Sequence, residues 1–255
     1  MKSWVVALGA GLLLVSASPA VAVDVDSAFS DERTAIAVYH PDKRWSGSPG
    51  ALEARPALSL AKLYLAYYVL YNGTDEEKGL VKEMIALSDD AIATRLDNAY
   101  PEAIGTIAED FNLPETHRNG SWGLSTTAAY DVAKFLASIL WDPKAKPLLD
   151  AMKNAPDIAQ DGFPQKFGTA KLDGATGFKT GWANEKDSAT ASVAYGQSGD
   201  EVWVAAALTN GDAYDNTADA ARGINQGETL RLERSWKFKA WRWGQPIPFT
   251  AGWPQ

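Results

Sequence analysis

The chain has 255 residues, 24 Lys and Arg against 32 Asp and Glu, a formal net charge of −8, and 46% hydrophobic residues. These values suit one large soluble domain and exclude intrinsic disorder, a collagen-like rod and a multispan membrane protein. The acidic charge argues against general binding of nucleic acid, and the absence of cysteine excludes disulfides, thiolate nucleophiles and Cys-ligated zinc.

The first 22 residues have the pattern of a secretory signal peptide. Lys2 supplies the positive start, residues 5–14 are apolar, and Ala20-Val21-Ala22 fits a small-x-small cleavage site. The apolar run is shorter than the roughly 20 residues that a bilayer span needs. We therefore predict cleavage near Ala22 and an exported protein, either secreted or held in the cell envelope.

The mature chain begins with a predicted strand and continues as a helical block. Residues 23–33 are expected to be a poorly ordered lead-in, 34–40 a strand and 44–56 a loop. Apolar positions at three- and four-residue steps then predict helices, one of them opened by a capping box of Thr74 and Glu77 and the last by a Ser125-Thr126-Thr127 cap. The predicted helices cover 57–72, 74–85, 89–100, 102–111 and 127–140.

After residue 173 the apolar period changes from helical to alternating. Residues 174–182, 188–195 and 201–209 predict a three-stranded antiparallel meander separated by turns. A helical block inserted into an antiparallel sheet is an α+β arrangement. We expect one mature domain, 23–255, with a helical lobe at about 57–172 and a sheet lobe made of 34–56 plus 173–255.

The two histidines do not suggest a catalytic or metal site. His40 is expected at a strand end and His117 in a loop, and neither has metal-type spacing around it. The chain also lacks a glycine-rich phosphate loop. No metal and no organic cofactor is predicted.

Ser59-Leu60-Ala61-Lys62 is a candidate for nucleophilic chemistry. A three-residue step in a helix places Ser59 and Lys62 on one face, close enough for the amine to accept the hydroxyl proton. The helix N-terminus adds free N–H groups near Ser59. A Ser-x-x-Lys pattern arises about once by chance in a chain of ordinary composition, so it needs support from elsewhere.

Two further motifs supply that support. Ser88-Asp89-Asp90 follows Ser59 by 29 positions, and Lys179-Thr180-Gly181 follows Ser88 by 91, inside the first predicted strand of the meander. Taken singly, Ser88 suits a helix N-cap and Lys179 suits an edge strand that discourages aggregation. A chance occurrence of all three motifs, in this order and each in a suitable structural context, is much less probable than a chance occurrence of any one of them.

At these three motifs the sequence resembles the class A-like serine β-lactamase and penicillin-binding protein superfamily, whose signature is Ser-x-x-Lys, Ser-x-Asn and Lys-Thr-Gly. The resemblance spans roughly residues 34–210. It implies a β-lactamase/transpeptidase-like fold, in which helices flank an antiparallel sheet and an all-helical lobe is inserted. It further implies that Ser59 is the nucleophile, Lys62 its base or one of two, and Ser88 a proton relay to the leaving nitrogen.

The resemblance also implies the substrate-binding residues. Lys179 with Thr180 would orient a substrate carboxylate, and Gly181 completes that motif. The main-chain N–H groups of Ser59 and Trp182 would form the oxyanion hole, and the Trp182 ring would lie beside the acyl group. Asp90 belongs to the same binding set.

Asp90 departs from the family pattern, which has Asn there. An ionised Asp only accepts hydrogen bonds. At about 4 Å and an effective dielectric of about 20, it would favour the Lys62 ammonium by roughly 4 kcal/mol, or about three pKa units. Repulsion between Lys62 and Lys179 acts in the opposite direction. The sequence leaves this balance open.

Two more departures argue against fast antibiotic hydrolysis. The short interval between Ser59 and Ser88 predicts a more open cleft than in class A enzymes. Glu115 and Asn119 have the mutual spacing of a deacylating loop, but their surroundings do not match it, and a surface carboxylate is the simpler interpretation of Glu115.

The C-terminal segment is rich in tryptophan and basic residues. Residues 231–243 hold five basic side chains against one acidic, and four of the ten Trp residues are Trp236, Trp241, Trp243 and Trp253. The segment suits either a membrane-surface or cell-wall contact, or aromatic packing on the sheet with solvated charges.

The sequence therefore predicts an exported serine hydrolase or acyltransferase, with a small-molecule β-lactam or a D-Ala-D-Ala-type peptidoglycan stem peptide as the partner that the resemblance implies. Two alternatives stay open. In one, Asp90 holds Lys62 as an ion pair and the cleft only binds wall peptides. In the other, the chain is a secreted scaffold that works through its Trp-rich tail.

Overall fold

The computed structural model describes residues 23–226, 241–242 and 245–246. The predicted signal peptide, 1–22, and most of the Trp-rich segment lie outside these residues, so both interpretations stay predictions. In the part that the structure describes, no helix is both long and apolar enough to cross a bilayer.

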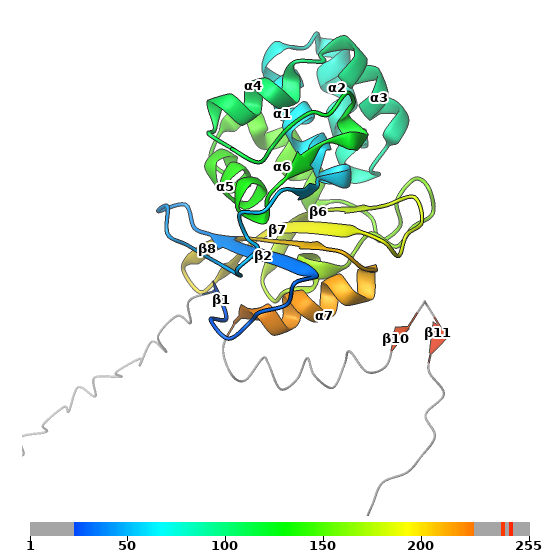
Figure 1. Cartoon of the computed structure of the whole chain (residues 1–255). Helices are drawn as coiled ribbons and strands as arrows, with labels where there is room; N and C mark the ends of the chain where they lie inside the picture. Colours follow the sequence, from blue (N-terminus) through cyan, green and yellow to red (C-terminus); the bar gives the residue numbers. More distant parts are fainter. Residues whose placement is uncertain (1–22, 227–240, 243–244, 247–255) are drawn as a thin grey trace, which may run out of the picture.

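A five-stranded antiparallel sheet forms the middle layer (Figure 1), with the strand order β3-β2-β8-β7-β6. The strands are β2 (Thr34–Tyr39), β3 (Trp45–Gly47), β6 (Ala175–Trp182), β7 (Thr190–Ser198) and β8 (Glu201–Thr209). The predicted meander is present, and β2 pairs with β8 from the other side. The predicted α+β class is confirmed.

Helices cover both faces of this sheet (Figure 1). Within residues 23–226, six lie on one side: α1 (Ala61–Asn72), α2 (Asp75–Ala86), α3 (Asp90–Ala99), α4 (Ala103–Asp110), α5 (Ala129–Ile139) and α6 (Lys146–Lys153). The seventh, α7 (Ala213–Gly223), covers the opposite face. The predicted capping box of Thr74 and Glu77 opens α2. Helices α6 and α7 were not predicted from the sequence.

The predicted cap of α5 is wrong. Residues 126–127 instead form the short strand β5, which pairs with β4 (Arg55–Pro56), and the N-cap residue of α5 is Ala128, which has no side chain that could cap it. The Thr127 hydroxyl lies 2.8 Å from the Tyr64 hydroxyl and 2.9 Å from that of Thr116. The Thr127 hydroxyl, which the local sequence assigns to the helix cap, is therefore engaged in tertiary contacts instead.

Two predicted loop segments also contain strands. Residues 44–56, expected to be loop, include β3, which pairs with β2, and β4. The expected lead-in, 23–33, contains β1 (Asp24–Val25), which pairs with β9 (Ile224–Asn225). Each of these strands has two or three residues, too few for alternation to reveal.

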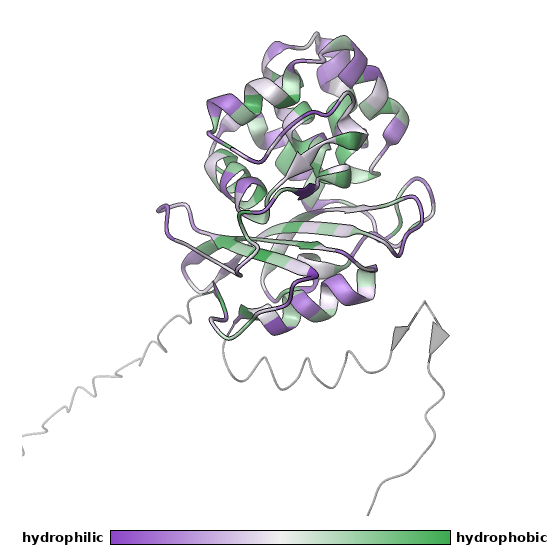
Figure 2. Cartoon of the chain, viewed as in Figure 1, coloured by the Kyte–Doolittle hydropathy of each residue, from purple (hydrophilic) through white to green (hydrophobic). Residues whose placement is uncertain are grey.

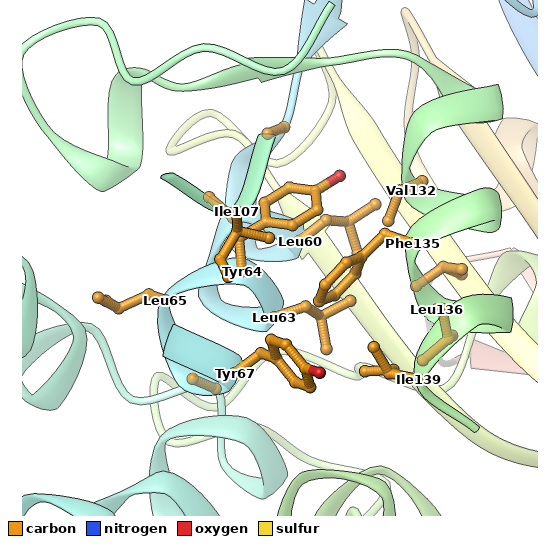
Figure 3. Close-up of a cluster of buried hydrophobic side chains, with 14 of the residues drawn as sticks. Leu60, Leu63, Tyr64, Leu65, Tyr67, Ile107, Val132, Phe135, Leu136 and Ile139 are labelled. Atoms are coloured by element: carbon orange, nitrogen blue, oxygen red, sulfur yellow. The ribbon is translucent and has the colours of Figure 1, made fainter. Parts of the chain in front are cut away.

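Successive side chains of the sheet strands pack alternately into two hydrophobic cores, one on each face of the sheet. In β2, Ala35 and Ala37 join the larger core beneath α1 and α5, whereas Ile36 and Val38 join the smaller one on the other face. Apolar residues follow the sheet and the inward sides of the helices in Figure 2. Figure 3 shows Tyr64 of α1 beside residues of α5. This packing holds α1 against α5.

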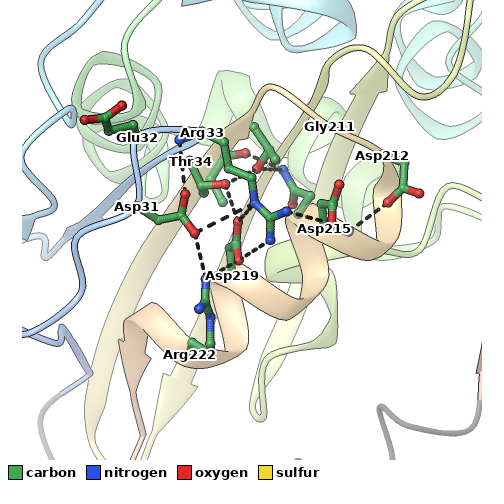
Figure 4. A network of polar contacts seen from close by, with 12 residues as sticks. Asp31, Glu32, Arg33, Thr34, Gly211, Asp212, Asp215, Asp219 and Arg222 are labelled. Atoms are coloured by element: carbon green, nitrogen blue, oxygen red, sulfur yellow. Dashed lines mark hydrogen bonds and ion pairs between the residues drawn. The ribbon is translucent and has the colours of Figure 1, made fainter.

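A buried carboxylate joins α7 to β2 (Figure 4). Asp219 has a fully buried side chain and accepts bonds from Arg33 at 2.8 and 2.9 Å and from Thr34 at 2.6 Å. Burial raises the pKa of Asp219, but the hydrogen bonds from Arg33, Thr34 and Arg222 outweigh it and hold the pKa below its ordinary value.

We expect Asp219→Ala to lower the free energy of unfolding by about 2–4 kcal/mol, because it removes the acceptor of two Arg33 bonds and of one bond from the buried Thr34 hydroxyl. Since the folded pKa of Asp219 is depressed, its stabilising effect is present above about pH 4 and is lost as pH falls through the folded pKa. Urea unfolding at several pH values measures both effects. Asp215→Asn is the control: Asp215 is partly exposed and accepts one Arg33 bond, so a loss as large as that of Asp219→Ala contradicts the prediction.

Candidate active site

Ser59 lies where the chain enters the first helix of the large core. It belongs to a short 3-10 helix, η1 (Leu58–Leu60), which continues directly into α1. Leu58 has a φ of +51°, a left-handed conformation that non-glycine residues rarely adopt. Ser59 is 8% exposed, and its Oγ lies 3.0 Å from Lys62 Nζ. A hydroxyl and an amine are thus in hydrogen-bonding contact on one helix face.

The amine of Lys62 is fully buried among acceptors. Its Nζ lies 2.6 Å from Asp90 Oδ1, 2.8 Å from the Ser88 carbonyl oxygen and 3.2 Å from Ser88 Oγ. The Asp90 side chain is 75% exposed, so it presents a carboxylate to solvent beside the buried amine. The ring of Trp122 lies over the same nitrogen, 4.5 Å from Nζ to the ring centroid.

The third motif, Lys179-Thr180-Gly181, lies in the sheet and brings Lys179 to the same cluster. Lys179 of β6 is 1% exposed, and its Nζ donates to Ser88 Oγ at 2.8 Å and to the Thr180 carbonyl at 2.9 Å. The Ser88 hydroxyl therefore stands between two lysine amines. Ser88 has a φ of +59° and precedes Asp89, whose side chain caps α3.

Burial dominates the electrostatics of both lysines. Desolvation lowers the pKa of Lys62 below its ordinary value, although the Asp90 carboxylate acts to raise it. Desolvation and repulsion from Lys62 lower the pKa of Lys179 well below its ordinary value. Burial therefore outweighs Asp90 in its effect on the pKa of Lys62, and this direction favours the neutral amine that a general base requires.

Gly181 allows β6 to approach the serine. A Cβ at Gly181 would lie 2.5 Å from the Ser59 main-chain nitrogen and 2.8 Å from Leu58 Cβ, closer than atoms tolerate. Only a residue without a side chain permits this approach. Gly181 therefore sets the spacing between the strand and the start of the helix.

The neighbours of Gly181 in the motif turn to the other face of β6, as strand alternation requires. The Thr180 hydroxyl is buried and donates to the Gln165 carbonyl at 2.7 Å, so it does not join the Ser59 cluster. The Trp182 ring stacks on Phe163 with centroids 4.7 Å apart, and its Nε1 donates to Asp161.

The remaining candidates lie apart from the cluster. The main-chain N–H of Glu115 donates to Asp131 at 2.8 Å, and no hydrogen bond within residues 23–226 joins its carboxylate to Ser59 or Lys62. Both ring nitrogens of His40 face main-chain carbonyls, those of Val23 and Val202.

Sequence reasoning missed Trp122 and Gln165. Gln165 is buried and its side-chain amide donates to the carbonyls of Ala86 and Pro156, which fixes the segment leading to Ser88. Neither residue belongs to a motif, and a single Trp in a Gly- and Ser-containing loop gave no signal.

The shape of the surface alone does not point to this cluster. A hollow of about 870 Å³ lies between α4 and residues 112–118 and is lined by residues such as Glu102, Glu109 and His117. Ser59, Lys62 and Lys179 are not among its lining residues. The chemistry of the side chains, rather than the size of the hollow, identifies the site.

Comparison with known proteins gives similarity in structure but not in sequence. No protein-family model and no curated protein sequence matches the chain. Among solved structures, the β-lactamase from Sphaerobacter thermophilus matches with a TM-score of 0.60 and 12% identity, over 74% of this chain and 88% of that one.

Two other solved structures match to a similar degree. The D-alanyl-D-alanine carboxypeptidase from Mycobacterium tuberculosis matches with a TM-score of 0.56 and 16% identity, over 88% of this chain and 97% of that one. The ampicillin-bound penicillin-binding protein D2 from Listeria monocytogenes matches with a TM-score of 0.59 and 16% identity, over 79% of this chain and 96% of that one. The chain has the fold shared by serine β-lactamases and penicillin-binding proteins.

Proposed function

We propose that this chain is an exported serine hydrolase or acyltransferase that is acylated at Ser59 by a β-lactam or by a wall-peptide amide of the D-Ala-D-Ala type. The observation that carries the proposal is the 3.0 Å contact between Ser59 Oγ and the amine of Lys62. This amine is buried, and burial lowers its pKa. The shared fold supports it, and the ampicillin-bound neighbour supports a penicillin as the probe.

In the proposed reaction, neutral Lys62 accepts the Ser59 proton while Oγ attacks the substrate carbonyl carbon. The main-chain N–H groups of Ser59 and Trp182 stabilise the oxyanion. Ser88, in contact with both amines, passes a proton to the leaving nitrogen as the C–N bond breaks, which leaves an ester on Ser59. Lys179, whose Nζ donates to Ser88 Oγ at 2.8 Å, holds that hydroxyl in position for the transfer.

Labelling with a fluorescent penicillin tests the proposal. The intact mass should rise by the mass of one probe, and peptide mapping should place the probe on Ser59. Ser59→Ala should abolish labelling, whereas Ser138→Ala, on the exposed side of α5, should leave it unchanged. An unchanged mass at high probe concentration contradicts the proposal.

We expect Asp90→Asn to accelerate acylation at neutral pH by about tenfold, since Asp90 acts to raise the pKa of Lys62 and most of its side chain is screened by solvent. The amide also gains donors for a substrate carbonyl. The rate of label incorporation against pH measures the effect, and its rising limb should move to lower pH in the variant. An unchanged rate and profile contradict the electrostatic role of Asp90.

A binding-only function is the second candidate, and the 2.6 Å contact between Lys62 and Asp90 favours it. If this ion pair holds Lys62 protonated, Ser59 has no base and the cleft binds wall peptides without reacting. Calorimetry with a D-Ala-D-Ala peptide would then show binding, while the penicillin leaves the mass unchanged.

A further inference from the structure

Trp122 forms a lid over the amine of the proposed base. It opens a short 3-10 helix, η2 (Trp122–Leu124), and its ring centroid lies 4.5 Å from Lys62 Nζ. Lys62 has no exposed surface, and its hydrogen bonds within residues 23–226 go to Ser59, Ser88 and Asp90. The ring therefore covers one side of the Lys62 amine.

Two hydrogen bonds hold Trp122 in position. The indole Nε1 donates to Thr94 Oγ1 at 3.1 Å, and the Trp122 main-chain N–H donates to Asp97 Oδ2 at 3.1 Å. Asp97 is buried and accepts two bonds from Arg118, at 2.7 and 2.8 Å. Both anchors belong to α3, the helix that begins at Asp90, so Trp122 is tied to the helix that carries a hydrogen-bond partner of Lys62.

The lid matters for the fate of the Ser59 ester. Hydrolysis needs a water molecule that attacks the ester carbonyl while a base takes its proton. Lys62, the proposed base, lies 3.0 Å from Ser59 Oγ, and the Trp122 ring lies over its amine. Among the described residues, Asp90 is the one carboxylate hydrogen-bonded to Lys62, and none is hydrogen-bonded to Ser59.

We propose that Trp122 is a positioning residue that keeps water away from Lys62 and so makes the Ser59 ester long-lived. This inference rests on the proposed function, because it concerns the ester that acylation forms. In the hydrolysis that Trp122 suppresses, water oxygen bonds to the acyl carbon, its proton passes to Lys62, and the Ser59 Oγ–carbon bond breaks as Oγ takes a proton back.

The test starts from the preformed ester, so changes in the acylation rate do not enter. The chain is labelled with a fluorescent penicillin, free probe is removed, and loss of the label is followed by intact mass. We expect Trp122→Ala to shorten the lifetime by at least about tenfold. Trp122→Phe keeps an aromatic ring, so the lifetime of its ester should stay close to that of the unmodified protein. Trp141→Ala should change nothing, since Trp141 is 65% exposed at the end of α5.

A second measurement distinguishes the loss of shielding at the Lys62 amine from a general loosening of the structure in Trp122→Ala. In Trp122→Ala the hydrolysis rate should rise with pH through the pKa of Lys62, because the exposed amine now acts on water; acceleration without that pH dependence overturns the inference. If Trp122→Ala fails to fold by circular dichroism, Thr94→Val removes one anchor of the ring and should shorten the lifetime to a smaller extent.

The outcomes distinguish the two proposals. Labelled protein whose ester lasts equally long with and without the Trp122 ring contradicts the lid and leaves the proposed function standing. Absence of label in the unmodified protein contradicts the proposed function and the lid with it.

Discussion

Lys62→Met should lower the rate of Ser59 acylation by about a thousandfold or more, because it removes the base and leaves an apolar side chain of similar length. Met also relieves the cost of burying an amine, so the variant should fold. Label incorporation over time gives the rate, and thermal unfolding checks the fold.

Two comparisons make this result specific. Lys62→Arg keeps a cation but cannot give up its proton, so it should be as inactive as Lys62→Met. Lys82→Met, on the exposed side of α2, should acylate normally. If Lys62→Arg retains the original rate, the side chain acts through its charge and not as a base.

The acylation rate of the unmodified protein should rise with pH and level off below pH 10.5. The free amine of Lys62 is the active form, and burial lowers the pKa of Lys62 from its ordinary value of 10.5. Rates of label incorporation from neutral to alkaline pH measure this limb. A rate that falls steadily as pH rises from neutrality would show that a protonated group, and not the free amine, limits the reaction.

Gly181→Ala should lower the acylation rate by about a hundredfold, with label incorporation as the measurement. The added methyl group would lie 2.5 Å from the Ser59 nitrogen, a main-chain atom at the start of a packed helix. Either β6 or η1 must shift, and a misplacement of about 1 Å at a reacting group costs on the order of a hundredfold in rate. Overpacking should also lower the free energy of unfolding, by about 1–3 kcal/mol.

Gly105→Ala is the matched control for this substitution. Gly105 lies in α4, where an added Cβ meets no atom within 4 Å. Alanine suits a helix better than glycine, so this variant should be slightly more stable and should acylate at the original rate. Full activity in Gly181→Ala would mean that the contact between β6 and Ser59 is not needed for the reaction.

Local features of the site were predictable because they depend on short-range geometry. Lys62 stands beside Ser59 because three residues nearly complete a helical turn. The capping box at Thr74 depends on residues three apart. The alternating patterns of 174–182 and 188–195 predicted the strand that carries Lys179 and the strand that pairs with it.

The cap predicted at Thr127 shows where short-range reasoning ends. A threonine before an amphipathic run favours a helix cap, but here its hydroxyl bonds Tyr64 and Thr116 instead. Helices α6 and α7 also went unpredicted. Their positions depend on packing against distant elements, and Asp219 of α7, for example, pairs with Arg33 of the segment before β2.

The sequence by itself determined the α+β class, the strand and helix that carry the motifs, and the pairing of Ser59 with Lys62, because each depends on residues only a few positions apart. The tertiary structure decided that Lys179 reaches Ser88 across 91 positions, that Trp122 covers Lys62, and that both amines lose solvent. Desolvation depends on every group that packs around an atom, and those groups come from all parts of the chain.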